Sequence, residues 1–174
     1  MFQMGKRQNI VLTGMPGVGK STVGVILAKR LGYSFLDTDI YIQTREGLSL
    51  QEIIAARGIK GFCDLEEQHL LTISLKAHVI ATGGSVVYRD RAMQHLQRNG
   101  FVVHLDLNCE KLKKRLDDIE QRGVVIAPGQ SINALYVERD ALYRRYADVT
   151  VETDNLTPDQ VIQKVYEIVA RMDT

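Results

Sequence analysis

The sequence is poor in the features that mark secreted, membrane or nucleic-acid-binding proteins. Only two of its 174 residues are cysteines, Cys63 and Cys109, and their spacing fits no metal site, so we expect two free thiols in a reducing cytoplasm. The net charge is only +1, which gives no electrostatic basis for binding nucleic acid or a membrane surface. No apolar run approaches the length of a membrane-spanning helix, and the apolar stretch at the start is too short for a signal peptide.

What the sequence does contain is typical of a globular enzyme domain. The chain is 45% hydrophobic and 25% charged, and its length suffices for one domain with a substantial core. We therefore expect a single domain over residues 1–174 that acts on a small molecule and works as a monomer.

One stretch carries most of the functional information. Residues 14–21 read GMPGVGKS and fit the pattern G-x-x-x-x-G-K-[ST] of phosphate-binding loops. Glycines let consecutive backbone N–H groups point toward a triphosphate without steric cost. The Lys20 ammonium would bind the β- and γ-phosphates, and the Ser21 hydroxyl would bind Mg²⁺. The residues predicted to bind the nucleotide are Gly14, Met15, Pro16, Gly17, Val18, Gly19, Lys20, Ser21 and Thr22.

Short apolar strands alternate with helical stretches along the chain. This alternation predicts an α/β fold with a parallel sheet covered by helices. We expect strands at residues 9–13, 33–36, 78–81, 101–105 and 148–151. We expect helices at residues 21–31, 40–46, 49–57, 59–76, 89–98, 110–120 and 131–147, and a last one from 157 onward.

Polar or glycine-rich segments follow two of the expected strands. Asp37 and Asp39 come after the second strand, and Gly83 and Gly84 after the third. Ligands bind outside the carboxyl ends of parallel strands, so these segments should lie beside the phosphate loop. One acid can hold the Mg²⁺ shell while the other orients an attacking hydroxyl. The alternatives are a plain turn at Asp37, a helix N-cap at Asp39 and a simple connecting turn at the glycines.

Residues 121–130 have no periodicity and contain Arg122 and Gly123, so we expect a mobile lid over about 119–130. Arg122 could close on the charge that develops during phosphoryl transfer and exclude water. A solvated loop arginine is the alternative.

The order of the segments GMPGVGKS, FLDTD, ATGG, a lid arginine and LYRRYAD resembles the shikimate kinase family over essentially the whole chain. The resemblance implies a three-layer α/β P-loop domain with a five-stranded parallel sheet in the order 2-3-1-4-5. It also implies transfer of the γ-phosphate of ATP, with Mg²⁺, to the 3-hydroxyl of shikimate.

On the donor side, the resemblance implies that Lys20 and Ser21 hold the phosphates and Mg²⁺. Asp37 matches the acid that holds the metal through water. Arg122 is the best candidate for the catalytic lid arginine, and Arg115 for the arginine that lies against adenine.

On the acceptor side, the resemblance implies that helices within about residues 39–76 bind shikimate. Asp39 matches the acid that binds the acceptor hydroxyl and can act as its base. Gly83 and Gly84 match a turn that contacts shikimate, and Arg144 matches the arginine that binds its carboxylate.

Three positions depart from the family pattern. The family has Phe-Arg-x-x-Glu where residues 62–66 read FCDLE, so Cys63 replaces an arginine that would bind the acceptor carboxylate. Ser85 replaces a third glycine, and Gly123 replaces the proline that usually follows the lid arginine. A charge-assisted hydrogen bond contributes roughly 1.5–3 kcal/mol, so its loss should weaken acceptor binding on the order of 10- to 100-fold.

Lys60 lies one helical turn before Cys63 and is our hypothesis for the missing charge; a solvated surface lysine is the alternative. Because the acceptor pocket is altered, a sister kinase for another hydroxylated acid is a second interpretation. A nucleotide-binding regulatory module with little turnover is a third. Asp39 argues against it, because a binding module needs no second acid.

Overall fold

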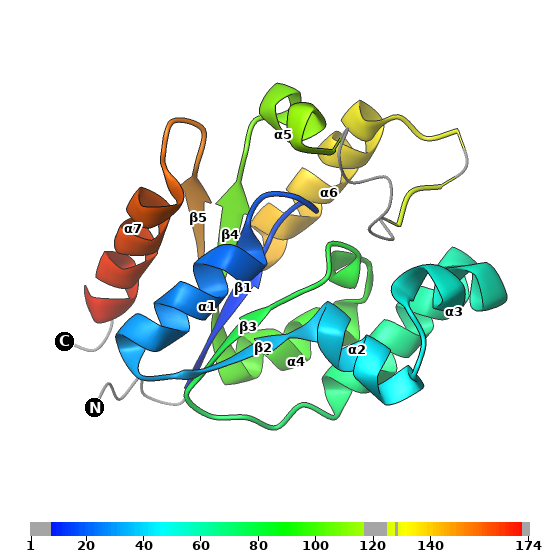
Figure 1. Ribbon diagram of the computed structural model, residues 1–174, viewed down its shortest axis with the longest axis horizontal. Coiled ribbons are helices and arrows are strands. Elements are labelled where there is room, and N and C mark those ends of the chain that lie inside the picture. The colour runs from blue at the N-terminus through cyan, green and yellow to red at the C-terminus, as the bar shows by residue number, and fades with distance from the viewer. Residues whose placement is uncertain (1–7, 117–124, 128, 172–174) are drawn as a thin grey trace.

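Five short strands form a single parallel sheet in the order β2-β3-β1-β4-β5 (Figure 1). The computed structural model describes residues 8–116, 125–127 and 129–171. The strands are β1 (Asn9–Thr13), β2 (Ser34–Asp37), β3 (His78–Ala81), β4 (Gly100–Asp106) and β5 (Val149–Glu152). All five strands lie within a residue or two of their predicted positions, and the parallel α/β class and strand order are confirmed.

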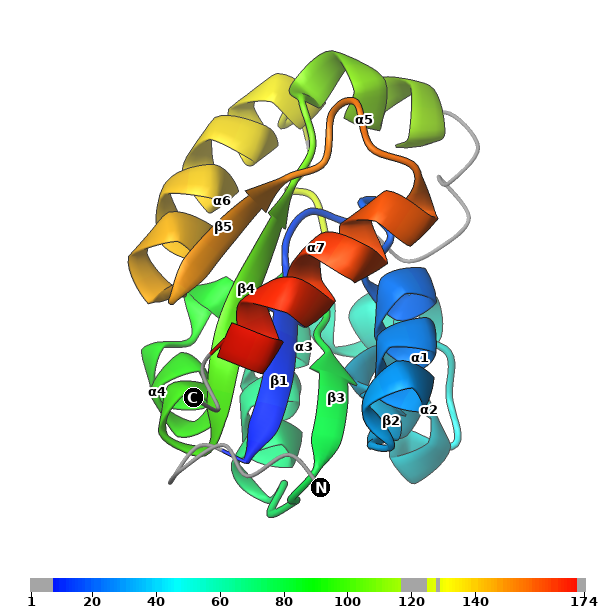
Figure 2. The ribbon, with the colours of Figure 1, turned by 90° about the vertical axis from the view of Figure 1, so that its left-hand side faces the viewer.

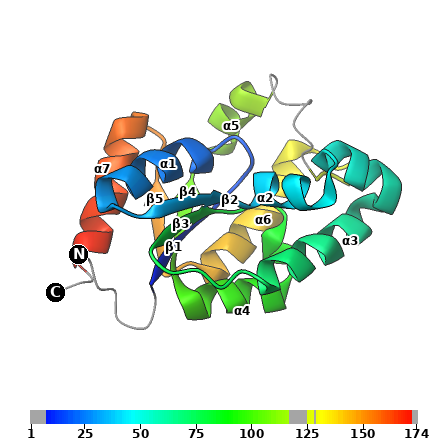
Figure 3. The ribbon, with the colours of Figure 1, turned by 60° about the horizontal axis from the view of Figure 1, so that its bottom comes forward.

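Helices cover both faces of the sheet and make the molecule three layers thick. On one face lie α1 (Lys20–Leu31) and α7 (Pro158–Ala170), and Figure 2 shows α7 crossing in front of the strands. On the other lie α4 (Asp90–Asn99) and α6 (Ile132–Tyr146), with α3 (Leu50–Leu71) packed beside α4 (Figure 3). The short elements α2 (Thr38–Glu46), η1 (Val86–Tyr88) and α5 (Cys109–Leu116) complete the described fold.

The helix starts follow local side-chain chemistry. Ser49 and Glu52 form a capping box at the start of α3, and Thr157 and Gln160 form another at α7. Ser131 caps α6 through a hydrogen bond from the Ala134 N–H. Each of these starts was predicted, because a hydroxyl side chain precedes an apolar periodic segment.

Gly58 interrupts α3. The sequence predicted that one helix ends at this glycine and that another begins after it. Its φ of 68° and ψ of 173° lie outside the helical region, and the helix changes direction there. The second half of α3 ends at Leu71, which is five residues earlier than predicted.

The hydrophobic core has two parts. The larger part surrounds the sheet, and its central strand β1 is buried at every position, as in parallel sheets covered on both faces. The smaller part joins α2 and α3 to a segment near residue 125 and consists of Ile42, Leu50, Ile53, Phe62, Cys63, Leu65 and Val125. Cys63 is therefore a packing residue, with 4% of its surface exposed. Among the helices of the described residues, none is long and apolar enough to cross a membrane.

Candidate active site

The phosphate loop connects β1 to α1 at the carboxyl edge of the sheet. Gly14 has φ 140°, and a Cβ there would lie only 2.4 Å from the Leu105 carbonyl oxygen, so no other residue fits this position. The Lys20 Nζ donates to the carbonyls of Gly14 at 2.7 Å and Met15 at 3.0 Å. Burial lowers the pKa of Lys20 to about 8, although Asp39 and Asp37 act to raise it. The loop thus surrounds a buried, positively charged amine.

Ser21 and Asp37 meet directly beside this loop. The Ser21 hydroxyl donates to one Asp37 carboxylate oxygen at 2.6 Å. The other oxygen accepts from the backbone N–H groups of Asp39 and Ile40 at 3.0 and 3.3 Å, so Asp37 is the N-cap of α2. An N-cap was considered only as the alternative role of Asp39, and the cap lies two residues earlier, at Asp37. A hydroxyl next to a carboxylate is an oxygen donor set of the kind that Mg²⁺ prefers, so the residues fit that ion.

Asp39 lies in the first turn of α2 and faces the same space as Lys20. Burial and then the nearby Asp37 raise the pKa of Asp39 to about 6, against the opposing effect of Lys20. A carboxylate of this basicity is still ionised at neutral pH and accepts a proton more readily than an ordinary aspartate.

The glycine turn after β3 is packed tightly against the acids. A Cβ on Gly83 would lie 2.5 Å from Glu66 Oε1 and 2.6 Å from Asp39 Oδ1. The backbone N–H of Gly83 also donates to Thr38 Oγ1 at 3.0 Å. This close approach explains why a glycine is needed at position 83. A turn that only connected β3 to the next element would not need one.

These segments enclose one cavity of about 700 Å³. Predicted site residues form a large part of its lining, namely Pro16, Gly17, Val18, Gly19, Lys20, Ser21, Thr22, Asp39, Gly84 and Arg115. Arg115 also donates to the carbonyls of Gly17 and Val18 at 3.4 and 3.3 Å, so it borders the phosphate loop from α5. Gly14, Met15, Asp37 and Gly83 belong to the same loops but are not part of this lining.

The structure does not bring Arg144 to the cavity. Its side chain is 46% exposed and pairs with Asp106 at 2.5 Å and Asp140 at 2.9 Å. The assignment of the carboxylate-binding arginine to Arg144 is therefore corrected. Arg144 lies on the outward face of α6, where these two acids already hold its guanidinium.

Arg139 lines the cavity instead and was missed from the sequence. It is 1% exposed, and its guanidinium donates to the Tyr88 hydroxyl at 3.1 Å and the Val125 carbonyl at 2.6 Å. Its Nη1 has no hydrogen-bond partner within the described part of the chain. Leu135, Arg139 and Tyr143 are all buried at four-residue spacing, so the helical period could have placed Arg139 on the inner face.

The sequence matches a protein-family model over nearly its whole length, because the model described as shikimate kinase covers residues 16–170. The chain belongs to the shikimate kinase family. A shikimate kinase of Thermodesulfovibrio yellowstonii is 36% identical over 95% of this chain and 96% of its own length. One from Pseudomonas aeruginosa is 39% identical over 91% of this chain and 94% of its own length.

Solved structures of the family have the same fold. Shikimate kinase from Acinetobacter baumannii, solved in complex with shikimate, gives a TM-score of 0.82 at 32% identity and covers 95% of this chain and 94% of its own. Shikimate kinase from Aquifex aeolicus gives 0.80 at 32% identity, covering 94% of this chain and 96% of its own. The protein is thus an ATP-dependent kinase that phosphorylates shikimate, which favours the first interpretation over a sister kinase or a regulatory module.

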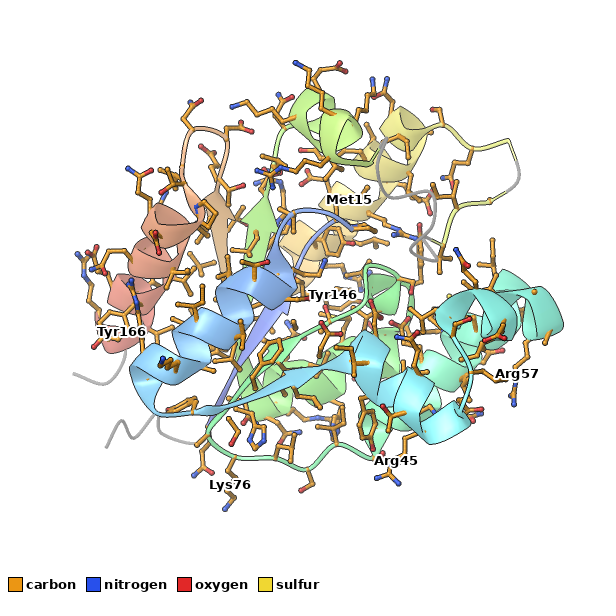
Figure 4. The ribbon with its side chains drawn as sticks, in the orientation of Figure 1. Met15, Arg45, Arg57, Lys76, Tyr146 and Tyr166 are labelled. Carbon is orange, nitrogen blue, oxygen red and sulfur yellow. The ribbon has the colours of Figure 1, made fainter. Side chains whose placement is uncertain are left out.

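Relative to its family, Cys63 removes an arginine, and Lys60 does not take that arginine's place in the cavity lining. Lys60 is exposed on α3 and lies outside the cavity lining, so the hypothesis that it supplies the missing charge is not supported. Arg57, the preceding cation, pairs with Glu46 at 3.6 Å and points away from the molecule (Figure 4). The helix changes direction at Gly58, between these two cations, and neither of them lines the cavity.

The predicted lid is only partly covered by the structure. Arg122 lies outside the described residues, as do most of residues 119–130. Of the described positions there, Val125 is buried against α2 and α3.

Proposed function

We propose that the cavity is where this kinase brings the γ-phosphate of ATP and the 3-hydroxyl of shikimate together. The observation that carries the proposal is the convergence of Lys20 and Asp39. They line one cavity, and each changes the pKa of the other. A phosphate-binding amine and a carboxylate base must be this close if an alcohol is to attack the terminal phosphorus.

On the donor side, the N–H groups of the phosphate loop and the Lys20 ammonium hold the phosphates. Ser21 and Asp37 would hold Mg²⁺, which would neutralise charge on the transferred group. Arg115 lies against the adenine from α5. Support for this arrangement comes from the Ser21–Asp37 contact of 2.6 Å and from the place of Arg115 in the lining.

On the acceptor side, Asp39 accepts a hydrogen bond from the 3-hydroxyl and takes its proton as the new bond to phosphorus forms. The backbone of Gly83 and Gly84 contacts the ring, and α2 and α3 form the acceptor wall. Arg139 binds the shikimate carboxylate, because its buried Nη1 has no partner among the described residues. A guanidinium held at two other nitrogens is preorganised for such a contact.

We propose that residues 119–130 close over the cavity as a lid and that Arg122 stabilises the charge of the transferred phosphoryl group. The buried Val125 supports this role, since its carbonyl oxygen accepts from Arg139 at 2.6 Å. The lid is therefore anchored, at Val125, on the residue that binds the acceptor.

We further propose that the enzyme works as a monomer in the cytoplasm. Its described residues contribute every proposed group except Arg122, so one chain supplies the site. Sedimentation equilibrium should give a mass near 19.6 kDa. A dimer at working concentration would contradict the monomer.

The deciding experiment measures ATP consumption with Mg²⁺ and shikimate for the wild type and Asp39→Asn. Loss of the carboxylate base should lower kcat on the order of 100- to 10,000-fold, with a smaller change in KM for ATP. Glu167→Gln, near the C-terminal end of α7, removes an equal charge at an exposed position outside the cavity lining and should leave kcat unchanged. An Asp39→Asn variant with near-normal kcat would overturn the role of Asp39.

A further inference from the structure

Glu66 is a fully buried acid beside the proposed acceptor site that the mechanism above does not use. It lies on α3 with 0% exposure. One carboxyl oxygen, Oε2, accepts from the Ser85 hydroxyl at 2.7 Å. The other, Oε1, is buried and has no hydrogen-bond partner anywhere in the described ranges. A carboxylate so poorly solvated is costly to keep ionised, whereas a protonated acid is not.

The charged groups around Glu66 favour the protonated form as well. The Asp39 carboxylate on α2 lies close to Glu66, because Asp39 Oδ1 and Glu66 Oε1 both lie within 2.6 Å of the point where a Cβ of Gly83 would stand. The cations whose charge acts on Glu66 are Arg139 on α6 and Arg89 ahead of α4, and Lys20 on α1 also interacts with it. Arg89 is already bound to Asp64 at 2.6 Å. Burial and then Asp39 raise the pKa of Glu66 to about 8, against the effects of Ser85, Arg139 and Arg89.

Two departures from the family pattern meet at this carboxyl group. Cys63 lies three residues before Glu66 on α3, a spacing that places both on one helix face. An arginine at that position would bring a positive charge beside the glutamate, and here that charge is missing. Ser85, in place of a glycine, supplies a neutral donor to the same acid. The loss of a cation and the gain of a hydroxyl are consistent with an acid that has also lost its charge.

We infer that Glu66 is a positioning residue that carries a proton in the working enzyme, and that loss of this proton weakens binding of the acceptor carboxylate. Glu66 acts through its hydrogen bond with Ser85, which lines the cavity, and through its electrostatic interaction with Arg139. With Cys63 in place of an arginine, Arg139 is the one cation among the described residues that we assign to the carboxylate. A negative charge on Glu66 would offset that attraction. This inference rests on the proposed acceptor site.

The test is an equilibrium titration of the nucleotide-free protein with shikimate at pH 7 and pH 9. For the wild type, Kd should rise by up to about tenfold between these pH values, because Glu66 changes from mostly protonated to mostly ionised. Glu66→Gln keeps the shape without the titration, so its affinity should match the wild type at pH 7 and change little at pH 9. A smaller rise in Kd that remains in Glu66→Gln would come from titration of Lys20, whose pKa is also about 8.

Two further variants make the test specific. Glu67→Gln removes the adjacent acid, which pairs with Arg91 at the surface at 3.4 Å, and should keep the wild-type pH dependence. Ser85→Ala removes the hydrogen bond that stabilises the ionised acid, so the midpoint of the affinity change should move to higher pH. This shift also distinguishes titration of Glu66 from a general loss of structure.

A wild-type Kd that is the same at pH 7 and pH 9 would overturn the inference, and so would an undiminished pH dependence in Glu66→Gln. A midpoint that stays in place in Ser85→Ala would do the same. These outcomes leave the acceptor site intact if Arg139→Lys still weakens binding at pH 7. If Arg139→Lys binds shikimate as the wild type does, the acceptor site itself is wrong, and the role of Glu66 falls with it.

Discussion

Arg139 is the residue on which acceptor recognition depends most. Its guanidinium is buried and fixed by Tyr88 and Val125, which leaves Nη1 for a ligand. A lysine cannot reproduce this geometry, because its single ammonium cannot hold both neighbours and a carboxylate. Arg139→Lys should therefore raise KM for shikimate on the order of 10- to 100-fold and leave KM for ATP nearly unchanged.

Arg144→Lys is the matched control on the same helix, since Arg144 is bound to Asp106 and Asp140 outside the cavity. Steady-state kinetics with each substrate varied in turn would separate the two arginines. An unchanged KM for shikimate in Arg139→Lys, together with a raised one in Arg144→Lys, would restore the assignment made from the sequence.

His104 should make the fold sensitive to acid. It is 2% exposed on β4 and stacks on Tyr143 with ring centroids 5.0 Å apart. Burial lowers its pKa from 6.5 to about 4, although Asp106 and Asp140 oppose the shift. The unfolded chain therefore binds the proton more readily, so this contribution to stability is present above pH 6.5 and is lost as the pH falls toward 4.

Between pH 7 and pH 5 the loss should be about 2 kcal/mol in the free energy of unfolding, measured by urea titration. Glu66 has the opposite pH dependence, because its folded pKa is raised, so the relevant quantity is the difference between the wild type and His104→Gln. His78→Gln, at the start of β3, should retain the full acid dependence. If His104→Gln shows the same dependence as the wild type, the histidine is not its source.

At the scale of elements, local patterns predict the strands and helix starts well but not which helix face meets the cavity. Ser131, Thr157 and Gly58 act within a few residues, so their roles could be read from the chain. Arg139 and Arg144 lie on one helix and differ only in direction, so a motif alone did not distinguish them. The choice depends on how α6 is rotated against β4, which the burial of Leu135 and Tyr143 fixes.

The turn between β3 and η1 is the element where packing leaves the least room. A methyl group on Gly83 would overlap Glu66 and Asp39, whose nearest oxygens lie 2.5 and 2.6 Å from the new carbon. Gly83→Ala should destabilise the fold by about 1–3 kcal/mol and lower kcat, because Asp39 must move.

Gly47→Ala is the control for this turn. Its φ of 67° strains any side chain, but the added carbon meets nothing within 4 Å. It should therefore lose stability and keep kcat. Thermal unfolding and turnover measured on the same preparations would distinguish the two, and a normal kcat in Gly83→Ala would show that the turn does not position Asp39.

At the scale of the whole molecule, the cavity joins parts of the chain that no sequence window contains. Lys20, Asp39, Ser85 and Arg139 come from both halves of the chain and both sides of the sheet. The phosphate loop could be predicted because its ligands are consecutive. The acceptor wall could not, because the neighbours of Glu66 and Arg139 are set by how α3, η1 and α6 pack together.

This arrangement predicts which parts of the chain each substrate should stabilise when it binds. Saturation at about 100 times Kd should stabilise the fold by about 2.7 kcal/mol, whichever substrate is used. Hydrogen exchange should then differ between substrates. An ATP analogue should protect the phosphate loop and the start of α1, whereas shikimate should protect α3 and α6, which hold its proposed wall. Arg139→Lys should lose the α6 protection at a fixed shikimate concentration, and Arg144→Lys should keep it. Protection by shikimate that is confined to the phosphate loop would mean that α3 and α6 do not form the acceptor wall.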